Sequence, residues 1–185
     1  MKNDQLIERG TRGVGVVAEF LKRKRARYDL IDHPETFAAT EEAYAAATSP
    51  VRMAKTVLLH DRGGFRAAVL PASERLDLQK ARALLHASGH LRLASEEEIE
   101  REFPVFDAGA MPPFGALLAT PEIIDPRLLR YRSILCSGGD HRHTLKISPR
   151  EIERLGEPLV ADICEAPNVR TGPLTDDSFR DALHK

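Results

Sequence analysis

The sequence of 185 residues has few cysteines and no long apolar stretch. Its two cysteines, Cys136 and Cys164, form no CxxC pair and have no histidines at zinc-ligand spacing, which indicates a reducing compartment and no structural zinc. No apolar run approaches the roughly 20 residues that span a bilayer. Residues 1–10 are polar and lack the apolar core of a signal peptide. These absences predict a soluble, cytoplasmic protein with no membrane partner.

The motifs of several familiar enzyme classes are absent as well. The chain has no GxxxxGK(S/T) or GxGxxG phosphate-binding loop, no GxSxG serine elbow and no HExxH zinc motif. Apolar neighbours around Cys136 indicate a buried, inert thiol rather than a nucleophile. The formal net charge is −1, so the overall charge does not point to nucleic acid. We expect no cofactor, no metal and no DNA partner.

The clearest element that the sequence does contain is a strand over residues 51–60. Its β-branched and aliphatic residues continue to the turn at residues 61–64, and residues 65–71 are predicted as the hairpin partner. Lys55 lies directly ahead of the apolar part of this strand. Burying an ammonium costs on the order of several kcal/mol unless anions or hydrogen bonds compensate it. Lys55 therefore either faces solvent on the polar side of the strand or points into a pocket whose anions or hydrogen-bond acceptors compensate its charge.

Amphipathic patterns and caps predict several helices. One helix covers about residues 13–27 and carries the basic run Lys22-Arg23-Lys24-Arg25, which is either an ordinary solvated helix end or a patch that contacts phosphate. Thr40 is expected to cap an alanine-rich helix. Ser95 and Ser148 each begin a capping box, with a glutamate three residues later.

Short strands are expected between these helices, which places the chain in the α/β (α+β) class. Residues 116–119 and 122–125 are predicted as two such strands. No repeat or linker divides the chain. We therefore expect one domain over residues 1–163, followed by a loosely structured tail over residues 164–185.

The stretch from Asp107 to Gly115 reads Asp-Ala-Gly-Ala-Met-Pro-Pro-Phe-Gly and is unlike the rest of the chain. Glycine lets the backbone approach another group closely, whereas Pro112-Pro113 removes two amide donors and stiffens the loop. A plain connection rarely needs so much control of its path. The stretch is therefore either a binding loop or an unusually constrained connection.

His141 and His143 lie two residues apart, so on a strand they face the same side. One interpretation is a metal site with His33 as a third ligand. The other is a pair of hydrogen-bonding histidines at the rim of a pocket. The second is favoured because no carboxylate cluster accompanies the pair.

Several of these motifs together resemble one family. The quoted motifs, in chain order, are His33-Pro34, Thr40-Glu41-Glu42-Ala43, Ala54-Lys55-Thr56, Leu76-Asp77-Leu78, Gly109 through Pro113-Phe114-Gly115, and Gly138-Gly139. This order is similar to that of the YbaK/ProX group of aminoacyl-tRNA editing domains, which occur free-standing and as an insertion domain of bacterial prolyl-tRNA synthetases. The resemblance covers roughly residues 28–155. It implies a compact fold with a mixed, strongly curved sheet and flanking helices, and hydrolysis of the ester that joins a wrong amino acid to tRNA.

The resemblance also assigns roles to residues. The family's essential lysine falls on Lys55, and His141 occupies a position where some members also carry histidine. The remaining residues are implied to contact the substrate: His33, Thr56, Gly109, Met111, Pro113, Phe114, Gly115, Gly138 and Gly139. The loop departs from the common Gly-(small)-Val-Ser-Pro-Phe-Gly pattern, and Met111 could change the size of the acyl pocket.

Two functions follow from this resemblance. The first is a deacylase that acts in trans on tRNA mischarged with a small amino acid such as alanine or cysteine, with Lys55 and His141 as catalytic residues and a water oriented by the substrate. The second is a binding module that holds an aminoacyl-like or peptide-like ligand in the same pocket without turnover. The implied partners are the aminoacylated 3′ end of tRNA and an aminoacyl-tRNA synthetase.

Overall fold

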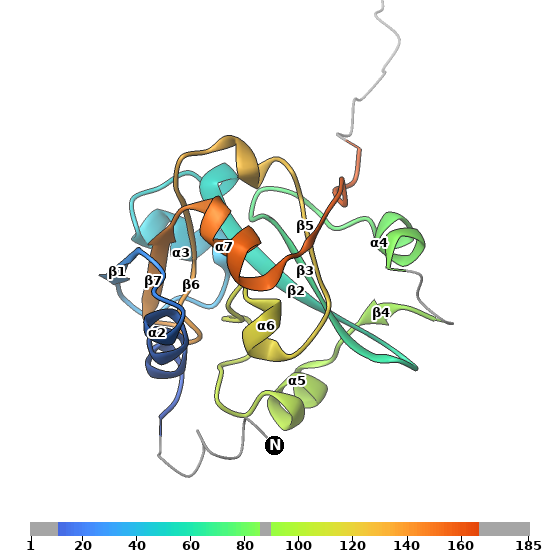
Figure 1. Ribbon diagram of the computed structural model, residues 1–185, viewed down its shortest axis with the longest axis horizontal. Helices are drawn as coiled ribbons and strands as arrows, with labels where there is room; N and C mark the ends of the chain where they lie inside the picture. The colour runs from blue at the N-terminus through green and yellow to red at the C-terminus, as the bar shows by residue number, and fades with distance from the viewer. Residues whose placement is uncertain (1–10, 86–89, 167–185) are drawn as a thin grey trace, which may run out of the picture.

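A mixed β-sheet forms the frame of the molecule (Figure 1), in a computed structural model that describes residues 11–85 and 90–166. Within these residues the sheet has eight strands, seven of them in the order β1-β7-β6-β2-β3-β5-β8, with β4 paired to β2. The strands are β1 (Tyr28–Asp32), β2 (Met53–Asp61), β3 (Gly64–Pro71), β4 (Arg92–Leu93), β5 (Glu122–Ile124), β6 (Ile134–Ser137), β7 (His143–Ile147) and β8 (Leu159–Val160).

The β2–β3 hairpin is the longest pairing in this sheet and confirms the prediction. Its register runs from Ala54 opposite Pro71 to Asp61 opposite Gly64. The turn forms because the Gly63 N–H donates to Asp61 Oδ1 at 2.7 Å, while Gly64 takes a positive φ of 104°. Strand β2 also pairs in parallel with β6, so Lys55 belongs to a central strand.

Helices cover the two faces of the sheet unequally. The main core lies on one face, where Ala54 and Leu58 of β2 pack with buried residues of three helices, α2 (Val14–Arg23), α6 (Gly115–Leu118) and α7 (Pro149–Gly156). Met53 and Leu59 point to the other face, because side chains alternate along a strand. There they pack in smaller clusters with α3 (Ala39–Ala45) and α4 (Leu78–Leu84). The predicted mixed sheet with flanking helices is confirmed.

The helix caps agree only in part with the sequence. Helix α5 (Glu96–Glu102) begins with the predicted capping box, in which Ser95 and Glu98 bond each other's amides. Ser148 precedes α7 but its side chain makes no cap bond. Thr40 lies inside α3, which starts after Ala38. The 3-10 turns Pro50–Arg52 (η1) and Leu128–Arg130 (η2) complete the helical elements of the described residues.

One predicted strand is wrong. Residues 116–119 belong mostly to the short helix α6, with Leu118 buried in the main core. A short apolar run does not distinguish a strand from a buried helical turn. Here the helix forms because the N–H groups of Leu117 and Leu118 both bond the Phe114 carbonyl, while Glu122 accepts from the amide of Gly115.

The predicted tail begins inside the folded part of the chain. Ile163 and Cys164 are buried, and Cys164 forms a β-bridge with Leu76. Residues 167–185 lie outside the described residues, so the domain limits at the C-terminus stay a prediction. No helix of the described residues is long and apolar enough to cross a membrane.

Candidate functional site

Lys55 points to the face of the sheet opposite the main core, and backbone carbonyls hold its ammonium. Lys55 Nζ donates to Glu74 O at 2.6 Å and, at the longer distance of 3.4 Å, to Ala72 O. Burial lowers the pKa of this half-buried lysine. Lys55 forms no ion pair with a carboxylate of the described residues. The dipoles of these two backbone carbonyls therefore stabilise its charge, and one N–H of the ammonium stays available to a further acceptor.

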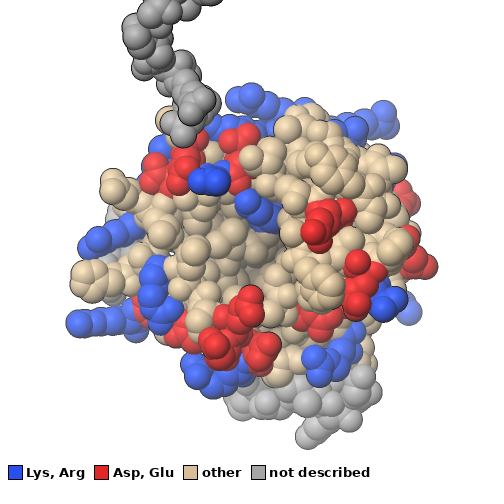
Figure 2. All heavy atoms as spheres, turned by 180° about the vertical axis from the view of Figure 1, so that it is seen from behind, with Lys and Arg blue, Asp and Glu red and all other residues tan. Residues whose placement is uncertain are grey.

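Two hydroxyl groups share this face of the sheet with Lys55. Ala54 pairs with Cys136 in the parallel ladder of β2 and β6, and both side chains lie in the main core. The next residues on the two strands, Lys55 and Ser137, therefore both point to the opposite face. Ser137 pairs in turn with Thr144 of β7. An ammonium and two hydroxyls thus project from three neighbouring strands. The view from behind in Figure 2 shows this face hollowed near its centre.

The loop of residues 107–115 is fastened to this row of polar groups. Ser137 Oγ donates to Ala110 O at 2.9 Å, and the Asp107 N–H donates to Gly139 O at 3.1 Å. The turn needs its glycine, because Gly139 has a φ of 98° and a Cβ there would lie 2.9 Å from Phe106 Cδ1. The structure thus brings the loop of residues 107–115, called the glycine–proline loop below, together with the Gly138-Gly139 turn.

Gly109 and His141 also meet. A Cβ added to Gly109 would lie 3.8 Å from His141 Cε1, and Gly109 itself has a φ of 84°. The His141 ring packs on Phe37 with ring centroids 4.8 Å apart. These three residues line a cavity of about 710 Å³, together with Phe106 and with Glu96 and Glu100 of α5. The Gly109 N–H has no hydrogen-bond partner within the described residues.

A buried network that the sequence did not predict lies beside Ser137. Thr144 Oγ1 hydrogen-bonds to Glu42 Oε1 and lies 3.0 Å from His33 Nε2, while His33 Nδ1 donates to Pro34 O at 2.7 Å. Burial raises the pKa of Glu42 to about 7. A protonated Glu42 can donate to Thr144, whose hydroxyl then donates to His33 Nε2. The network can therefore hold or release one proton near neutral pH. In the sequence, the motif Thr40-Glu41-Glu42-Ala43 is the feature that could have identified Glu42 as a residue of the site.

Other predicted site residues lie apart from Lys55. Met111 and Phe114 are buried in the main core, where Phe114 contacts Phe20 at a ring distance of 5.7 Å. Thr56 points to the same side, and its Oγ1 is buried with no partner in the described part of the chain. Pro113 is buried, and Gly115 begins α6. Contact of these residues with an acyl group stays a prediction.

The two histidines of the 141–143 segment do not share a strand face. Strand β7 begins at His143, so His141 lies in the preceding turn. His143 Nδ1 lies 2.6 Å from Asp140 Oδ1, whereas His141 packs on Phe37. The interpretation of a shared face is therefore wrong, because the Gly-Gly turn extends through His141.

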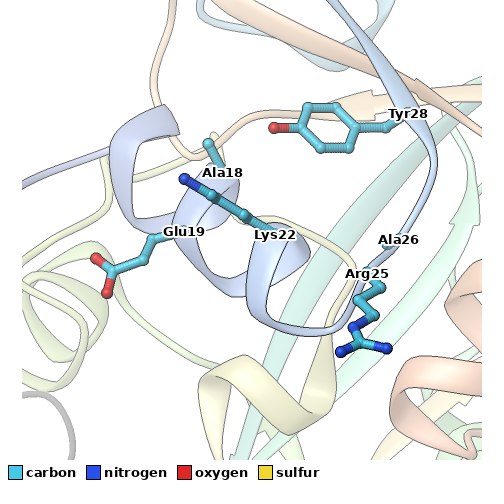
Figure 3. A pocket seen from close by; sticks show the side chains of 6 residues that line it. All are labelled: Ala18, Glu19, Lys22, Arg25, Ala26 and Tyr28. Atoms are coloured by element: carbon cyan, nitrogen blue, oxygen red, sulfur yellow. The ribbon is translucent and has the colours of Figure 1, made fainter.

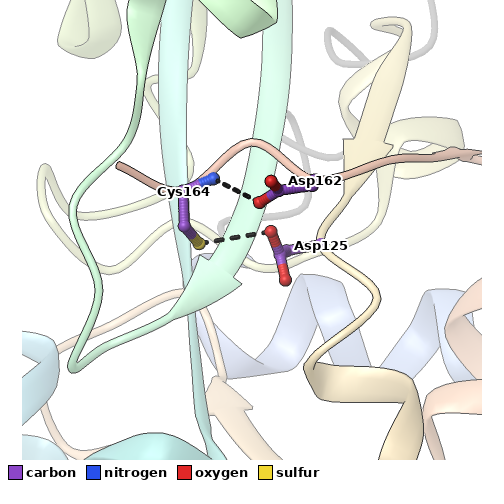
Figure 4. Close-up of side chains that lie close together, drawn as sticks. All are labelled: Asp125, Asp162 and Cys164. Carbon is purple, nitrogen blue, oxygen red and sulfur yellow. Dashed lines mark hydrogen bonds between the residues drawn. The ribbon is translucent and has the colours of Figure 1, made fainter. Parts of the chain in front are cut away.

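The one group of potential metal ligands within the described ranges is elsewhere and contains no histidine. It consists of Asp125, Asp162 and Cys164, whose ligand atoms lie within 4.8 Å of one another (Figure 4). Both carboxylates already pair with the Arg127 guanidinium, whose Nη1 lies 2.8 Å from an oxygen of each. The cluster is thus an ion-pair network.

The basic end of α2 lies on another surface. Lys22 and Arg25 line a cavity of about 580 Å³ with Ala18, Glu19, Ala26 and Tyr28 (Figure 3). Arg154 Nη2 donates to Lys24 O at 3.2 Å and so fixes the helix end. Contact of this surface with phosphate stays a prediction.

Solved structures share this fold over most of the chain. A candidate trans-editing enzyme for prolyl tRNA synthetase matches with 28% identity and a TM-score of 0.74, covering 83% of this chain and 97% of the other. The hypothetical protein APE2540 matches with 26% identity and a TM-score of 0.73, covering 81% and 99%. A scaffold protein used for computational epitope grafting matches with 25% identity and a TM-score of 0.73, covering 83% and 97%.

No curated protein matches the chain. A family model, by contrast, matches residues 33–155, and its description is aminoacyl-tRNA editing domain. The matched range contains Lys55, the glycine–proline loop, the Gly138-Gly139 turn and His141. The chain therefore belongs to the aminoacyl-tRNA editing domain family, in the YbaK-type group that its motifs indicated.

Proposed function

We propose that this protein is a trans-acting deacylase that hydrolyses the ester of mischarged aminoacyl-tRNA. The proposal rests on one observation, the set of groups that surround the Lys55 ammonium. Its ammonium is held by two backbone carbonyls, has no carboxylate partner among the described residues, and lies on the same face as Ser137, which fastens the glycine–proline loop. An ammonium held in this way can donate a hydrogen bond to an anionic or carbonyl oxygen of a substrate.

An aminoacyl ester is already reactive, so the site needs to position it and to stabilise the charge that develops on its carbonyl oxygen. The free N–H of Lys55 binds the carbonyl oxygen or a neighbouring phosphate. The Gly109 N–H is the better second donor, because Gly109 is exposed and its N–H has no partner in the described residues. The Gly139 N–H is buried and already lies 3.4 Å from Ser137 Oγ.

Hydrolysis then needs only water. Water adds to the carbonyl carbon, the tetrahedral intermediate places its negative charge between Lys55 and Gly109, and the bond to the ribose oxygen breaks. The ribose oxygen takes the proton that the attacking water gives up and leaves as a hydroxyl, and the acyl group leaves as the free amino acid. His141 adjoins Gly109 and orients the attacking water, together with the neighbouring ribose hydroxyl of the substrate.

We further propose that the acyl group is small, with alanine and cysteine as candidates. Pro112 and Pro113 stiffen the loop, and the Ser137–Ala110 hydrogen bond fixes its position, so the loop cannot widen freely. Selectivity between acyl groups that differ by one methylene is expected to be modest, about 1–3 kcal/mol.

A panel of aminoacyl-tRNAs tests this function. The purified protein is mixed in excess with each aminoacyl-tRNA, and loss of the ester is followed with time. We expect faster ester loss for at least one small acyl group, with uncharged tRNA as product. Binding of an aminoacyl-tRNA without faster ester loss across the whole panel would instead support the non-catalytic binding module.

A further inference from the structure

The position of the Lys55 ammonium depends on the loop between β3 and α4. This loop contains both carbonyls that bind Lys55 Nζ, those of Ala72 and Glu74. Ala72 is tied back to β2, since its N–H donates to Met53 O at 2.7 Å. Glu74 belongs to a turn, since its N–H donates to Pro71 O at 3.0 Å. The loop beyond Glu74, residues 75–77, is held by another segment of the chain.

Residues 161–165 hold the far part of this loop. The Asp77 N–H donates to Ile163 O at 2.8 Å, and the Glu165 N–H donates to Arg75 O at 2.9 Å. Lys80 of α4 adds a third link, because its Nζ donates to Cys164 O at 2.7 Å. Residues 161–165 lie beyond the range 33–155 that matches the family model.

The same segment is anchored on its other side to the buried end of β5. Asp125 is fully buried and accepts hydrogen bonds from the Ile163 N–H at 3.1 Å and from Cys164 Sγ at 3.2 Å (Figure 4). Arg127 Nη1 links this carboxylate to Asp162, at 2.8 Å from an oxygen of each. Asp162 also accepts from Lys80 Nζ at 2.8 Å. A chain of alternating charges thus runs from β5 across the segment to α4.

We propose that residues 161–165, with Asp125, Arg127 and Lys80, form a C-terminal clasp that positions Lys55 by fixing the loop that binds its ammonium. The clasp touches neither substrate nor reacting atoms, so its members are positioning residues. Its kinetic consequence rests on the proposed deacylase function, whereas its effect on Lys55 does not.

The surroundings of Lys55 agree with this role. Burial lowers the pKa of Lys55, and the neighbouring charged side chains that act on it, Glu74 and Arg75, belong to the loop that the clasp holds. Opening the clasp would expose the ammonium to water. Its pKa would then rise towards the ordinary value of 10.5.

Asp162→Lys tests the clasp, because it places a third cation beside Lys80 and Arg127. Asp29→Lys is the matched control, since Asp29 is an exposed aspartate of β1, paired with Lys146 at 4.0 Å, at the edge of the sheet opposite to β8. Asp162→Asn keeps an oxygen acceptor and should show the same changes at a smaller size. If the Asp162→Lys protein does not fold, the Asp162→Asn protein is used for the test instead.

Three readouts are compared at a temperature where all variants are folded. Hydrogen exchange reports the amides of Asp77 and Glu165, NMR of methylated lysines reports the titration of Lys55, and steady-state deacylation reports kcat and KM. In Asp162→Lys we expect about tenfold faster exchange of both amides, a higher pKa for Lys55, and kcat about tenfold lower with little change in KM. Asp29→Lys should match the wild type.

Two outcomes would overturn the proposal. In the first, the two amides exchange faster but Lys55 titrates as in the wild type and kcat is unchanged, so the clasp is structural only. In the second, Asp162→Lys and Asp29→Lys do not differ. If instead the wild type deacylates no aminoacyl-tRNA, the proposed function fails, while exchange and the Lys55 titration still decide the clasp.

Discussion

Burial of Glu122 makes the stability of the protein depend on pH. It is buried beneath the glycine–proline loop, where its Oε2 accepts from the Gly115 N–H at 2.9 Å and its Oε1 has no partner in the described residues. Burial raises the pKa of Glu122 to about 7, against an ordinary value of 4.5. At about 1.4 kcal/mol per pKa unit, this difference corresponds to about 3 kcal/mol.

The sign follows from proton binding. Because the folded pKa is raised, the folded protein binds more protons than the unfolded chain between about pH 4.5 and about pH 7. The free energy of unfolding therefore falls as pH rises through this window, and the contribution of Glu122 levels off above it. Glu122→Gln cannot ionise, so it removes this contribution while keeping the size of the side chain.

Urea unfolding followed by circular dichroism measures the effect at several pH values from 5 to 8. The stability of Glu122→Gln relative to the wild type should rise across this range by up to about 3 kcal/mol. Glu42 has the same sign but is present in both proteins, so it cancels. Glu102→Gln, at an exposed position of α5, should show no such rise. A stability difference between Glu122→Gln and wild type that does not change with pH would refute the reasoning.

Two further predictions, tested with three substitutions, concern packing in the fold. Gly139→Ala should destabilise the protein by about 3 kcal/mol, from a positive φ and a Cβ 2.9 Å from Phe106, whereas Gly64→Ala, with a similar φ and nothing within 4 Å, should lose only about 1–2 kcal/mol. Equal losses in urea unfolding would contradict the steric argument. Thr56→Val should stabilise the protein by about 1 kcal/mol, because it removes a buried hydroxyl that has no partner in the described residues, and should leave deacylation unchanged. Slower deacylation by this variant would place Thr56 at the substrate, as its sequence motif predicted.

The sequence predicts local features of this fold well because their causes are local. The β2–β3 hairpin follows from Gly63-Gly64 between two apolar runs, and the Ser95 capping box from a glutamate three residues later. Helix α6 was mistaken for a strand because four apolar residues show no period. Its helical form depends on a bond from Gly115 to Glu122 across the following turn.

The candidate site was predicted only where its motifs lie within one segment. Lys55, Gly109 and the Gly138-Gly139 turn could be selected from their residue types and order. The bond between Glu42 and Thr144 joins residues 102 positions apart, and the bond between Lys80 and Asp162 spans 82 positions. Such pairs leave no periodic pattern in a single sequence, so neither the buried network nor the clasp could be predicted.

The rate at which Lys55→Ala deacylates mischarged tRNA is the most direct test of the proposed chemistry. Lys146→Ala is its control, since Lys146 is an exposed lysine of β7 that pairs with Asp29 instead of with backbone carbonyls. With an aminoacyl-tRNA that the wild type hydrolyses, single-turnover deacylation should fall by roughly 10²-fold or more in Lys55→Ala and stay at the wild-type rate in Lys146→Ala. Circular dichroism should show both variants folded. A Lys55→Ala protein that is folded and hydrolyses the ester at the wild-type rate would contradict a catalytic role for this ammonium.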